Sequence, residues 1–457
     1  MKLNIKDLEK ATSGKLIINN HECLIENISI DSREYKENSL FIPIIGETHD
    51  GHKFLNSAYE NGYRVFLCDN NHDFTKDDIT LIKVEDTKKS LGDIAKYIRN
   101  KYDIDYIGVT GSVGKTTTRD MIYSVLSSKY KTLKNDKNYN NEIGVPKTLF
   151  NLDSKIEKAV IEMGMSVKGE LDYLASIVKP SIAVISNIGM SHIENFENQE
   201  GIFNAKMEIT NYFNKDSILI VNGDDKYLKT LKTKKLNYKV LTYGLDKNND
   251  LYAYDIKLNI DKSSFKTIIN NNEEKFTINV PAEHNVLNAL SAILVGLNSN
   301  MTVEEIRKGL ESLELTSGRL TVIKKKDFTI IDDSYNASCD SMISALNVIK
   351  KYTNRKICVL GDILETGKYD EELHRKVGKN ITNDIDLLVT VGKSSLYIED
   401  EAIKNGYINK KLHFENYEEL IKNIEKILIK DSVILFKSSH GIHLDLVVKH
   451  VLENYEN

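Results

Sequence analysis

The chain has 457 residues, more than one hydrophobic core usually supports, so we expect several domains. Its 62 Lys and Arg residues nearly balance its 67 Asp and Glu residues, which excludes a general nucleic-acid binder and requires local groups for any anionic ligand. The four cysteines lack C-x-x-C spacing and no apolar run reaches membrane-spanning length, so we expect a cytoplasmic protein without a zinc motif, a disulfide framework or membrane insertion.

Residues 1–104 are predicted to form a small N-terminal α/β domain. A short helix near the N-terminus ends at Gly14, and strands follow at residues 24–30 and 40–45. Ser32 and Arg33, with the polar turn at residues 49–52, have the donors to hold a diphosphate or a uracil edge. A polar loop with an Asx turn explains the same residues, and composition alone favours this simpler interpretation.

The stretch at residues 106–118 is the strongest motif in the chain. A β-branched run leads into Thr-Gly-Ser-Val-Gly-Lys-Thr-Thr, and the apolar spacing beyond it predicts a helix. Glycines let backbone N–H groups face an anion, and Lys115 and Thr116 suit the β/γ-phosphates and Mg²⁺. Val109 stands where the full G-x-x-x-x-G-K-[ST] pattern has glycine, so the motif is the shorter G-x-x-G-K-T. The sequence predicts a nucleoside-triphosphate site built from Gly111, Ser112, Val113, Gly114, Lys115, Thr116 and Thr117.

Two polar residues follow the next buried strands. Glu162 ends a predicted strand at residues 158–161, and His192 follows a predicted strand at residues 182–185. Ligands of open α/β sheets lie beyond the carboxyl ends of the strands, so we expect both residues near the phosphate loop. A carboxylate and an imidazole beside Thr116 would suit a metal for phosphoryl transfer. A helix-capping Glu and a loop His are the structural alternative, which their joint occurrence with the loop disfavours.

Residues 105–315 are predicted to form the central domain, a phosphate-loop ATPase with a parallel sheet. Near its end, a helix begins at about residue 283 and carries His284 and Asn288 on one face. An Asn amide can both donate to and accept from an adenine edge. A polar cluster at the helix end is an equally good interpretation.

Residues 316–457 are predicted to form a Rossmann-like C-terminal domain. Strands at residues 328–331, 357–360, 387–391 and 433–436 alternate with helical stretches. Asp332 and Asp333 follow the first of these strands. No G-x-G-x-x-G occurs, so a dinucleotide cofactor is not indicated. The expected fold class is α/β with three domains.

Together these motifs resemble the Mur ligase family over essentially the whole chain. The residues that carry the resemblance are Asp31-Ser32-Arg33, Asp50-Gly51-His52, residues 110–117 and 138–146, Glu162-Met163-Gly164, residues 191–194 and 205–208, His284-Asn285, Gly318-Arg319 and residues 333–337. The Asn-Asn-Glu-Ile-Gly and Asp-Ser-Tyr-Asn-Ala segments are more specific to the branch that adds D-alanyl-D-alanine.

The resemblance implies a catalytic role for Lys115, Glu162, His192 and Lys206. Lys115 would bind the γ-phosphate of ATP. The implied metal ligands are Thr116, Glu162, His192 and Lys206. Lys206 would be carbamylated, because a bare ammonium repels Mg²⁺ whereas a carbamate supplies an anionic oxygen.

The resemblance also implies where the substrates bind. Asn288 would contact adenine, and Arg319 and Asp333 would bind phosphate and ribose. Ser32 and Arg33 would lie in the UDP-binding domain. Further substrate contacts are implied for Asn140, Asn141, Tyr335 and Asn336.

Three positions depart from the family pattern. Lys437-Ser438-Ser439-His440 stands where Lys-Gly-Ser-Arg is usual, Cys339 where proline is common, and Lys147 where an apolar residue is usual. The missing Arg weakens the expectation of a dipeptide or phosphate contact there, since a protonated His440 is a poorer substitute.

The activity implied by the resemblance is an ATP-dependent ligase of peptidoglycan precursor synthesis. It would join D-alanyl-D-alanine to UDP-N-acetylmuramoyl-tripeptide through an acyl phosphate, using ATP and Mg²⁺. These small molecules are the expected partners, with no nucleic acid and no membrane, and the chain is expected to be a monomer. The alternatives are a ligase that adds another amino acid, a phosphate-loop kinase, and a non-catalytic nucleotide-binding paralogue.

Overall fold

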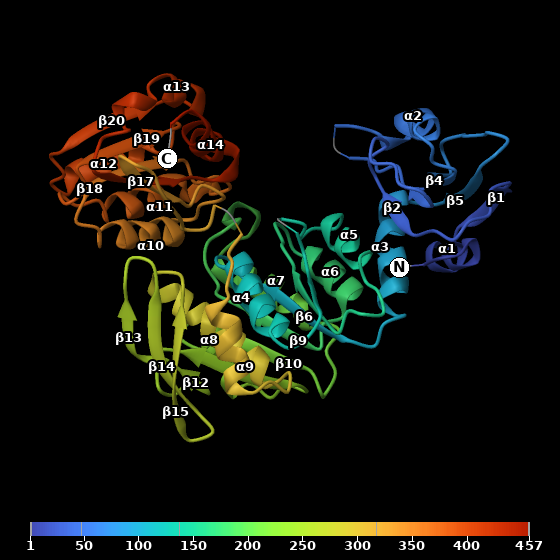
Figure 1. Cartoon of the computed structure of the whole chain (residues 1–457), viewed down its shortest axis with the longest axis horizontal. Helices are drawn as coiled ribbons and strands as arrows, with labels where there is room; N and C mark the ends of the chain where they lie inside the picture. Colours follow the sequence, from blue (N-terminus) through green and yellow to red (C-terminus); the bar gives the residue numbers. More distant parts are fainter. Residues whose placement is uncertain (1, 47, 137, 317, 456–457) are drawn as a thin grey trace. The chain divides into compact units, whose positions relative to one another are not determined.

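The computed structural model of the chain describes residues 2–46, 48–136, 138–316 and 318–455. The predicted outer domain limits at residues 1 and 457 therefore lie outside the described residues, and the inner limits stay predictions. Within the described ranges the strands form four sheets of five, seven, three and six strands, with helices between them. Figure 1 labels the helices and strands by these names where there is room.

The first sheet has the strand order β1-β5-β4-β3-β2, with β1 antiparallel to β5 and the other neighbours parallel. A capping box between Asn4 and Asp7 starts α1, and Ser13 ends it in a left-handed conformation, one residue before the predicted Gly14. The two predicted strands of this region are found as β2 and β3, both shorter than expected. The elements are α1 (Ile5–Thr12), β1 (Lys15–Asn19), β2 (Asn27–Ser29), β3 (Ser39–Phe41), η1 (Gly51–Phe54), α2 (Leu55–Glu60), β4 (Val65–Asp69), β5 (Thr80–Val84) and α3 (Thr87–Arg99).

The second sheet has the order β12-β11-β10-β9-β6-β8-β7. The predicted strands at residues 158–161 and 182–185 are confirmed as β8 and β9, and the helix after the phosphate loop is α4. All four residues of β9 are buried, as expected for a strand covered on both faces. The elements are β6 (Asp105–Thr110), α4 (Lys115–Ser127), β7 (Thr132–Lys134), α5 (Gly144–Leu149), β8 (Lys158–Glu162), α6 (Glu170–Val178), β9 (Ile182–Ile185), η2 (Ile193–Asn195), α7 (Gln199–Met207), η3 (Glu208–Thr210), β10 (Ile218–Asn222), η4 (Leu228–Thr233), β11 (Lys239–Gly244) and β12 (Leu251–Tyr252).

A three-stranded antiparallel sheet, β13-β14-β15, lies inside the region that the sequence predicted as parallel. Asn270 and Asn271 form the two-residue turn between β14 and β15 with φ of 51° and 65°, the backbone that a type I′ hairpin requires. Figure 1 shows the three strands side by side. The helix predicted from about residue 283 is confirmed as α8. The elements are β13 (Tyr254–Leu258), β14 (Ser263–Ile269), β15 (Asn272–Ile278), α8 (Glu283–Leu297) and α9 (Val303–Glu311).

The fourth sheet has the order β16-β17-β21-β18-β19-β20 and is antiparallel only between β16 and β17. Alternate strand residues supply two cores, one packed with α10, α11 and α12 and the other with α13 and α14, which gives three layers. The four predicted strands are confirmed as β17, β18, β19 and β21 (Figure 1). The elements are β16 (Thr321–Lys324), β17 (Phe328–Asp332), α10 (Cys339–Ile349), β18 (Arg355–Gly361), η5 (Gly367–Tyr369), α11 (Asp370–Gly378), β19 (Leu387–Val391), α12 (Leu396–Lys404), β20 (Lys410–Phe414), α13 (Tyr417–Lys422), η6 (Ile424–Lys426), β21 (Ser432–Lys437), η7 (His440–Ile442) and α14 (Leu444–Asn454).

By its internal packing, the chain divides into two compact units. Unit 1 comprises Met1–Gly108, Tyr130–Ala183 and Glu208–Ser217, and unit 2 comprises Val109–Lys129, Val184–Met207 and Ile218–Asn457. Among the described helices, none combines the length and the apolar character that crossing a bilayer requires.

Candidate nucleotide and metal site

The phosphate loop lies in unit 2 and leads into the N-terminus of α4. Gly111 has φ of 152° and Gly114 has φ of 82°, so glycine is required at both turns. A Cβ on Gly111 would lie 1.9 Å from the Ser186 hydroxyl. No side chain caps α4, so its first N–H groups and its partial positive charge are directed at whatever the loop holds. This arrangement suits a phosphate group.

Two residues after β9 hold the loop in this shape, and the sequence analysis assigned no role to either. The Asn187 side chain accepts from the Val113 N–H (2.9 Å) and donates to the Val113 carbonyl (2.9 Å). Ser186 donates to the same carbonyl (2.6 Å), and the Ser112 N–H donates to the Asn187 carbonyl (3.1 Å). The sequence feature that could have identified both residues is their position directly after a buried strand, at the carboxyl end of a parallel sheet.

The polar atoms around the loop include two with no hydrogen-bond partner among the described residues. The buried Ser112 hydroxyl and the Nε of Arg319 are both in this state. The Lys115 ammonium donates to the carbonyls of Gly111 (2.8 Å) and Ser112 (3.2 Å). Buried donors without partners are costly, and a bound polyphosphate would satisfy them.

Arg319 connects the start of the C-terminal part to this loop. Its Nη2 donates to the Thr116 hydroxyl (3.2 Å), and its guanidinium lies 4.1 Å from the ring centre of Tyr335. The His440 ring stacks on the same Tyr335, with centroids 5.8 Å apart. The next helix residues Thr116 and Thr117 are buried. Loop and arginine therefore face one another within unit 2, as phosphate binding by both would require.

Asn288 lies directly behind the loop. Its carbonyl accepts from the Thr118 hydroxyl (3.1 Å), its amide donates to Asn285 (3.3 Å), and a Cβ on Gly114 would lie 3.3 Å from it. These contacts support the loop, and the predicted contact with adenine stays a prediction. His284 at the start of the same helix pairs with Ser344 (2.7 Å), and burial lowers the pKa of its imidazole to about 4.

Asp333 is engaged within the protein. Its carboxylate lies 2.5 Å from the ammonium of the buried Lys437 and accepts from the Leu320 N–H (3.2 Å). Lys437 also donates to the Asn336 carbonyl (3.2 Å), so it holds the Asp-Ser-Tyr-Asn-Ala segment against β21. The Asn336 side chain is exposed and lines a cavity of about 180 Å³.

That cavity also contains Lys115 and His192. His192 has φ of 59°, and its Nδ1 lies 2.5 Å from a carboxylate oxygen of Glu365, a residue that the sequence analysis did not single out. Met190, Cys339 and Leu364 contribute to the apolar part of its wall. The cavity therefore joins the phosphate loop to the segment that contains Asn336, for which a substrate contact is predicted.

Lys206 is the most unusual residue of unit 2. Its side chain is only 2% exposed and has no ion-pair partner among the described residues. Burial, followed by the charge of Lys115, pushes the pKa of its ammonium well below the ordinary value. A neutral amine in this place is the form that reacts with carbon dioxide, so the residue fits a carbamate better than it fits an ammonium ion.

Glu162 belongs to unit 1, where an asparagine cluster surrounds it. Its side chain accepts from Asn140 (2.8 Å), and its backbone N–H and carbonyl both bond to Asn135. Asn141 has a local role, since its carbonyl accepts from the Gly144 N–H (2.9 Å) at the start of α5. The structure brings Glu162 and Asn140 together, and the expected meeting of Glu162 with the phosphate loop stays a prediction.

A second cavity, of about 520 Å³, lies within unit 1. Its wall includes Ser29 and the cationic side chains Lys36, Lys134 and Lys147. The predicted substrate residues Ser32 and Arg33 lie in the sequence between two residues of its wall, Ser29 and Glu34. Neither is among the described residues that line the cavity. Arg33 is exposed and pairs with Asp31, holding the pKa of that carboxyl down at about 2.

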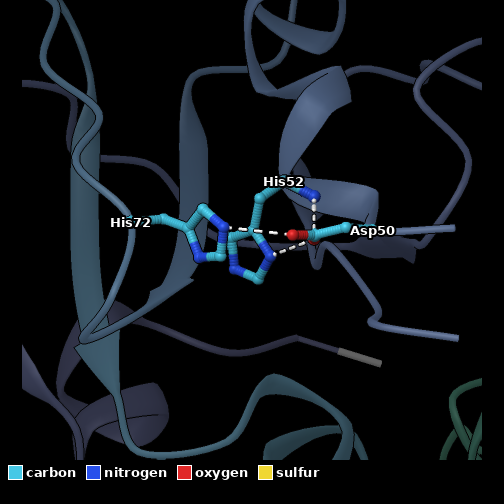
Figure 2. Close-up of side chains that lie close together, drawn as sticks. All are labelled: Asp50, His52 and His72. Carbon is cyan, nitrogen blue, oxygen red and sulfur yellow. Dashed lines mark hydrogen bonds and ion pairs between the residues drawn. The ribbon is translucent and has the colours of Figure 1, made fainter.

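The polar turn at residues 49–52 belongs to a network of imidazoles and carboxylates, shown in Figure 2. Asp50 lies 2.8 Å from Nδ1 of His52 and 3.1 Å from Nε2 of His72, and the two rings stack at 4.0 Å. Nε2 of His52 accepts from the Asp69 N–H (3.3 Å), and Nδ1 of His72 lies 2.7 Å from the Asp69 carboxylate. Each ring nitrogen therefore has a partner within the protein, and the network is a clasp that joins the turn at Asp50 to the turn at His72.

Comparison with known proteins places this architecture. Three family models match consecutive parts of the chain: the Mur ligase family catalytic domain over residues 24–99, the Mur ligase middle domain over 109–296, and the Mur ligase glutamate ligase domain over 318–440. The chain belongs to the Mur ligase family. The predicted family and the three-domain α/β fold class are confirmed.

Several of its relatives within that family carry the same name. The chain is 36% identical to the UDP-N-acetylmuramoyl-tripeptide–D-alanyl-D-alanine ligase of Bacillus subtilis over 99% of both chains, and 29% identical to the ligase of that name from Escherichia coli over 94% of both. The crystal structure of MurF from Acinetobacter baumannii matches with a TM-score of 0.90 at 29% identity over 99% of both chains. MurF ligase from Thermotoga maritima, solved in complex with ADP, matches with a TM-score of 0.81 at 25% identity over 93% of this chain and 96% of that one.

Proposed function

We propose that this chain is an ATP-dependent ligase that joins D-alanyl-D-alanine to UDP-N-acetylmuramoyl-tripeptide in peptidoglycan precursor synthesis. The observation that carries the proposal is the buried Lys206, which has no ion-pair partner among the described residues and is affected by the charge of Lys115 in the phosphate loop. Relatives aligned over nearly the whole chain bear the name of this activity. ATP as co-substrate argues for a reaction in the cytoplasm, and we propose a monomer.

The reaction needs two steps because a carboxylate does not react with an amine at neutral pH. The tripeptide carboxylate attacks the γ-phosphorus of ATP, ADP leaves, and an acyl phosphate forms. The amine of the dipeptide then attacks the acyl carbon, and inorganic phosphate leaves as the amide forms. In such transfers the protein contributes mainly position and charge neutralisation.

The residues of unit 2 are suited to the first step. The loop N–H groups and the α4 N-terminus would hold the phosphates, with Lys115 neutralising the γ-phosphate. Arg319 would add a second cation from the far side of Thr116. The unpartnered Ser112 hydroxyl would gain an acceptor. Asn187 keeps the loop in the shape that these contacts need.

The donor set also suits Mg²⁺. We propose that Thr116, His192 and a carbamylated Lys206 hold it, with Glu162 as the further carboxylate that the family resemblance implies. When bound, Mg²⁺ supplies charge neutralisation on the phosphate oxygens. A hydroxyl, an imidazole and an anionic carbamate are compatible ligands, whereas the ammonium form of Lys206 would repel the ion.

We propose that the second substrate lies along the cavity between His192 and Asn336, and that the nucleotide part of UDP-N-acetylmuramoyl-tripeptide binds in the cavity of unit 1. Lys36, Lys134 and Lys147 are the wall residues suited to a diphosphate, beside the carboxylates of Glu26, Glu34 and Asp136 in the same wall, and Tyr35 offers a ring for the uracil. On this proposal the unusual Lys147 contributes a cation to the substrate site.

The direct test is a ligation assay with purified protein, ATP, Mg²⁺, the UDP-muramoyl tripeptide and D-alanyl-D-alanine, with products identified by mass. We expect the amide product with ADP and phosphate in equal amounts. Lys115→Ala should lose about 10²- to 10³-fold or more in rate, because it removes a charge at the transferring phosphoryl group. ADP formed with a phosphorylated product and no amide would instead indicate a kinase.

A further inference from the structure

Glu365 belongs to the loop that connects β18 to η5, and it has no role in the scheme above. Its carboxylate lies 2.5 Å from Nδ1 of His192. That nitrogen is buried and has no aligned hydrogen-bond partner among the described residues, so the Glu365 carboxylate is the group that compensates it. The two residues are far apart in the sequence, and both belong to unit 2.

Both backbones are held in an uncommon conformation to make this contact. Glu365 and His192 each have φ of 59°, the left-handed region that residues with side chains rarely adopt. Such a conformation persists only where the surroundings enforce it, and it is often found at functional sites. Here the strained pair meets at the wall of the cavity that also contains Lys115.

The neighbouring residues fix how the loop lies against the His192 turn. A Cβ on Gly367 would come within 2.8 Å of the Glu194 side chain, so only glycine allows the close approach of the loop. Asp340 lies close to Gly189, with a carboxylate oxygen 3.6 Å from the position that a Cβ on Gly189 would occupy. The Glu365 side chain is 48% exposed, so its position is not set by core packing.

The charges are consistent with this contact. The contact with His192 holds the pKa of the Glu365 carboxyl below its ordinary value. A carboxylate placed against one imidazole nitrogen restricts the orientation of the ring and leaves the other nitrogen available as a ligand.

We propose that Glu365 is a positioning residue that holds the His192 imidazole in the orientation needed to bind the metal of the ATP site. This inference rests on the proposed function in one respect, since it takes His192 to be a metal ligand. Glu365 lies in the C-terminal part of the chain, whereas the proposed metal ligands all lie outside that part. The inference therefore gives the C-terminal part a role in the metal site.

The test compares Glu365→Gln and Glu365→Ala with the wild-type chain in the presence of ADP. Mn²⁺ is the probe, and its binding is measured from the electron paramagnetic resonance signal of the free ion. We expect about 10- to 100-fold weaker Mn²⁺ binding in both variants, with Glu365→Asp between them and the wild type. The Michaelis constant for D-alanyl-D-alanine should be unchanged, and excess Mn²⁺ should recover part of the ligation rate.

Glu194→Gln is the matched control, because it removes an exposed carboxylate from the same turn and keeps the Cβ that Gly367 contacts. It should bind Mn²⁺ as the wild type does. Unchanged Mn²⁺ affinity in the Glu365 variants overturns the inference, and a raised Michaelis constant for the dipeptide alone would assign Glu365 to the dipeptide amine instead. Failure of the wild type to ligate would refute the proposed function, while the Mn²⁺ comparison would still decide the role of Glu365.

Discussion

Two lysines of unit 2, Lys206 and Lys437, are each only 2% exposed. Among the described residues, Lys437 has a carboxylate partner in Asp333, whereas Lys206 has no ion-pair partner and is affected by the like charge of Lys115. Removing an ammonium from water costs several kcal/mol unless a partner offsets it. The first lysine is therefore held as an ion pair, whereas burial and the like charge of Lys115 lower the pKa of the second.

The proposed carbamate on Lys206 can be tested directly. Protein equilibrated with ¹³C-labelled bicarbonate should show a carbamate carbonyl resonance that is missing from Lys206→Ala. The variant should also lose about 10²- to 10³-fold in ligation rate, because an anionic ligand is removed from the metal. Full ligation by a protein without this resonance would show that the amine itself is the working group.

The Lys437–Asp333 pair predicts a different behaviour. Lys437→Met leaves a buried carboxylate without its partner and should lower the free energy of unfolding by about 3–5 kcal/mol. Chemical denaturation measures this loss. The double variant Lys437→Met/Asp333→Asn should be less destabilised than the single one, because the uncompensated charge is gone. Equal losses in both proteins would mean that the pair is not the source of the effect.

At the scale of elements, turns are held by side chains from other segments. The phosphate loop owes its shape to Ser186 and Asn187, which follow β9. The turn at Asp50 is held in the same way, by His72 beyond the end of β4. Such contacts join residues that are distant in sequence, so local sequence patterns do not reveal them.

The clasp at Asp50 should make the stability of its two turns depend on pH. The bond to Asp69 raises the pKa of His72, so its contribution is fully present below the ordinary imidazole value of about 6.5 and is lost as pH rises through the raised pKa. Hydrogen exchange of peptides covering residues 50–72 should therefore show that protection falls as pH rises through the raised pKa of His72. His72→Gln should remove this dependence, and an unchanged profile would exclude His72 as its source.

At the scale of the whole molecule, Arg319 connects the C-terminal part of unit 2 to the phosphate loop through Thr116. A nucleotide bound at this loop would contact both parts. Ligands that bind only the folded state stabilise it, by about 2.7 kcal/mol at a hundredfold excess over the dissociation constant.

ADP should therefore raise the melting temperature of the chain and increase the hydrogen-exchange protection of β17 and β21. Arg319→Ala should reduce both effects, because it removes the cation that the C-terminal part supplies. Lys308→Ala, a change on the outer part of α9, serves as the control for loss of one positive charge. An equal ADP shift in Arg319→Ala would place the nucleotide out of reach of Arg319.

Local patterns determined much of this protein. Local sequence predicted the Gly-Lys-Thr motif, the buried strands β8 and β9 and the helix α8. Turns, strands and helices can be predicted in this way because they depend on short-range backbone preferences and on apolar spacing. The resemblance to Mur ligases supplied Lys206, which no pattern had marked. Tertiary structure alone decided that Lys206 is buried without a partner, that Asn187 holds the loop and that Glu365 meets His192. Burial and contacts between distant segments arise only when the chain has packed, and they set the charge and orientation on which the chemistry depends.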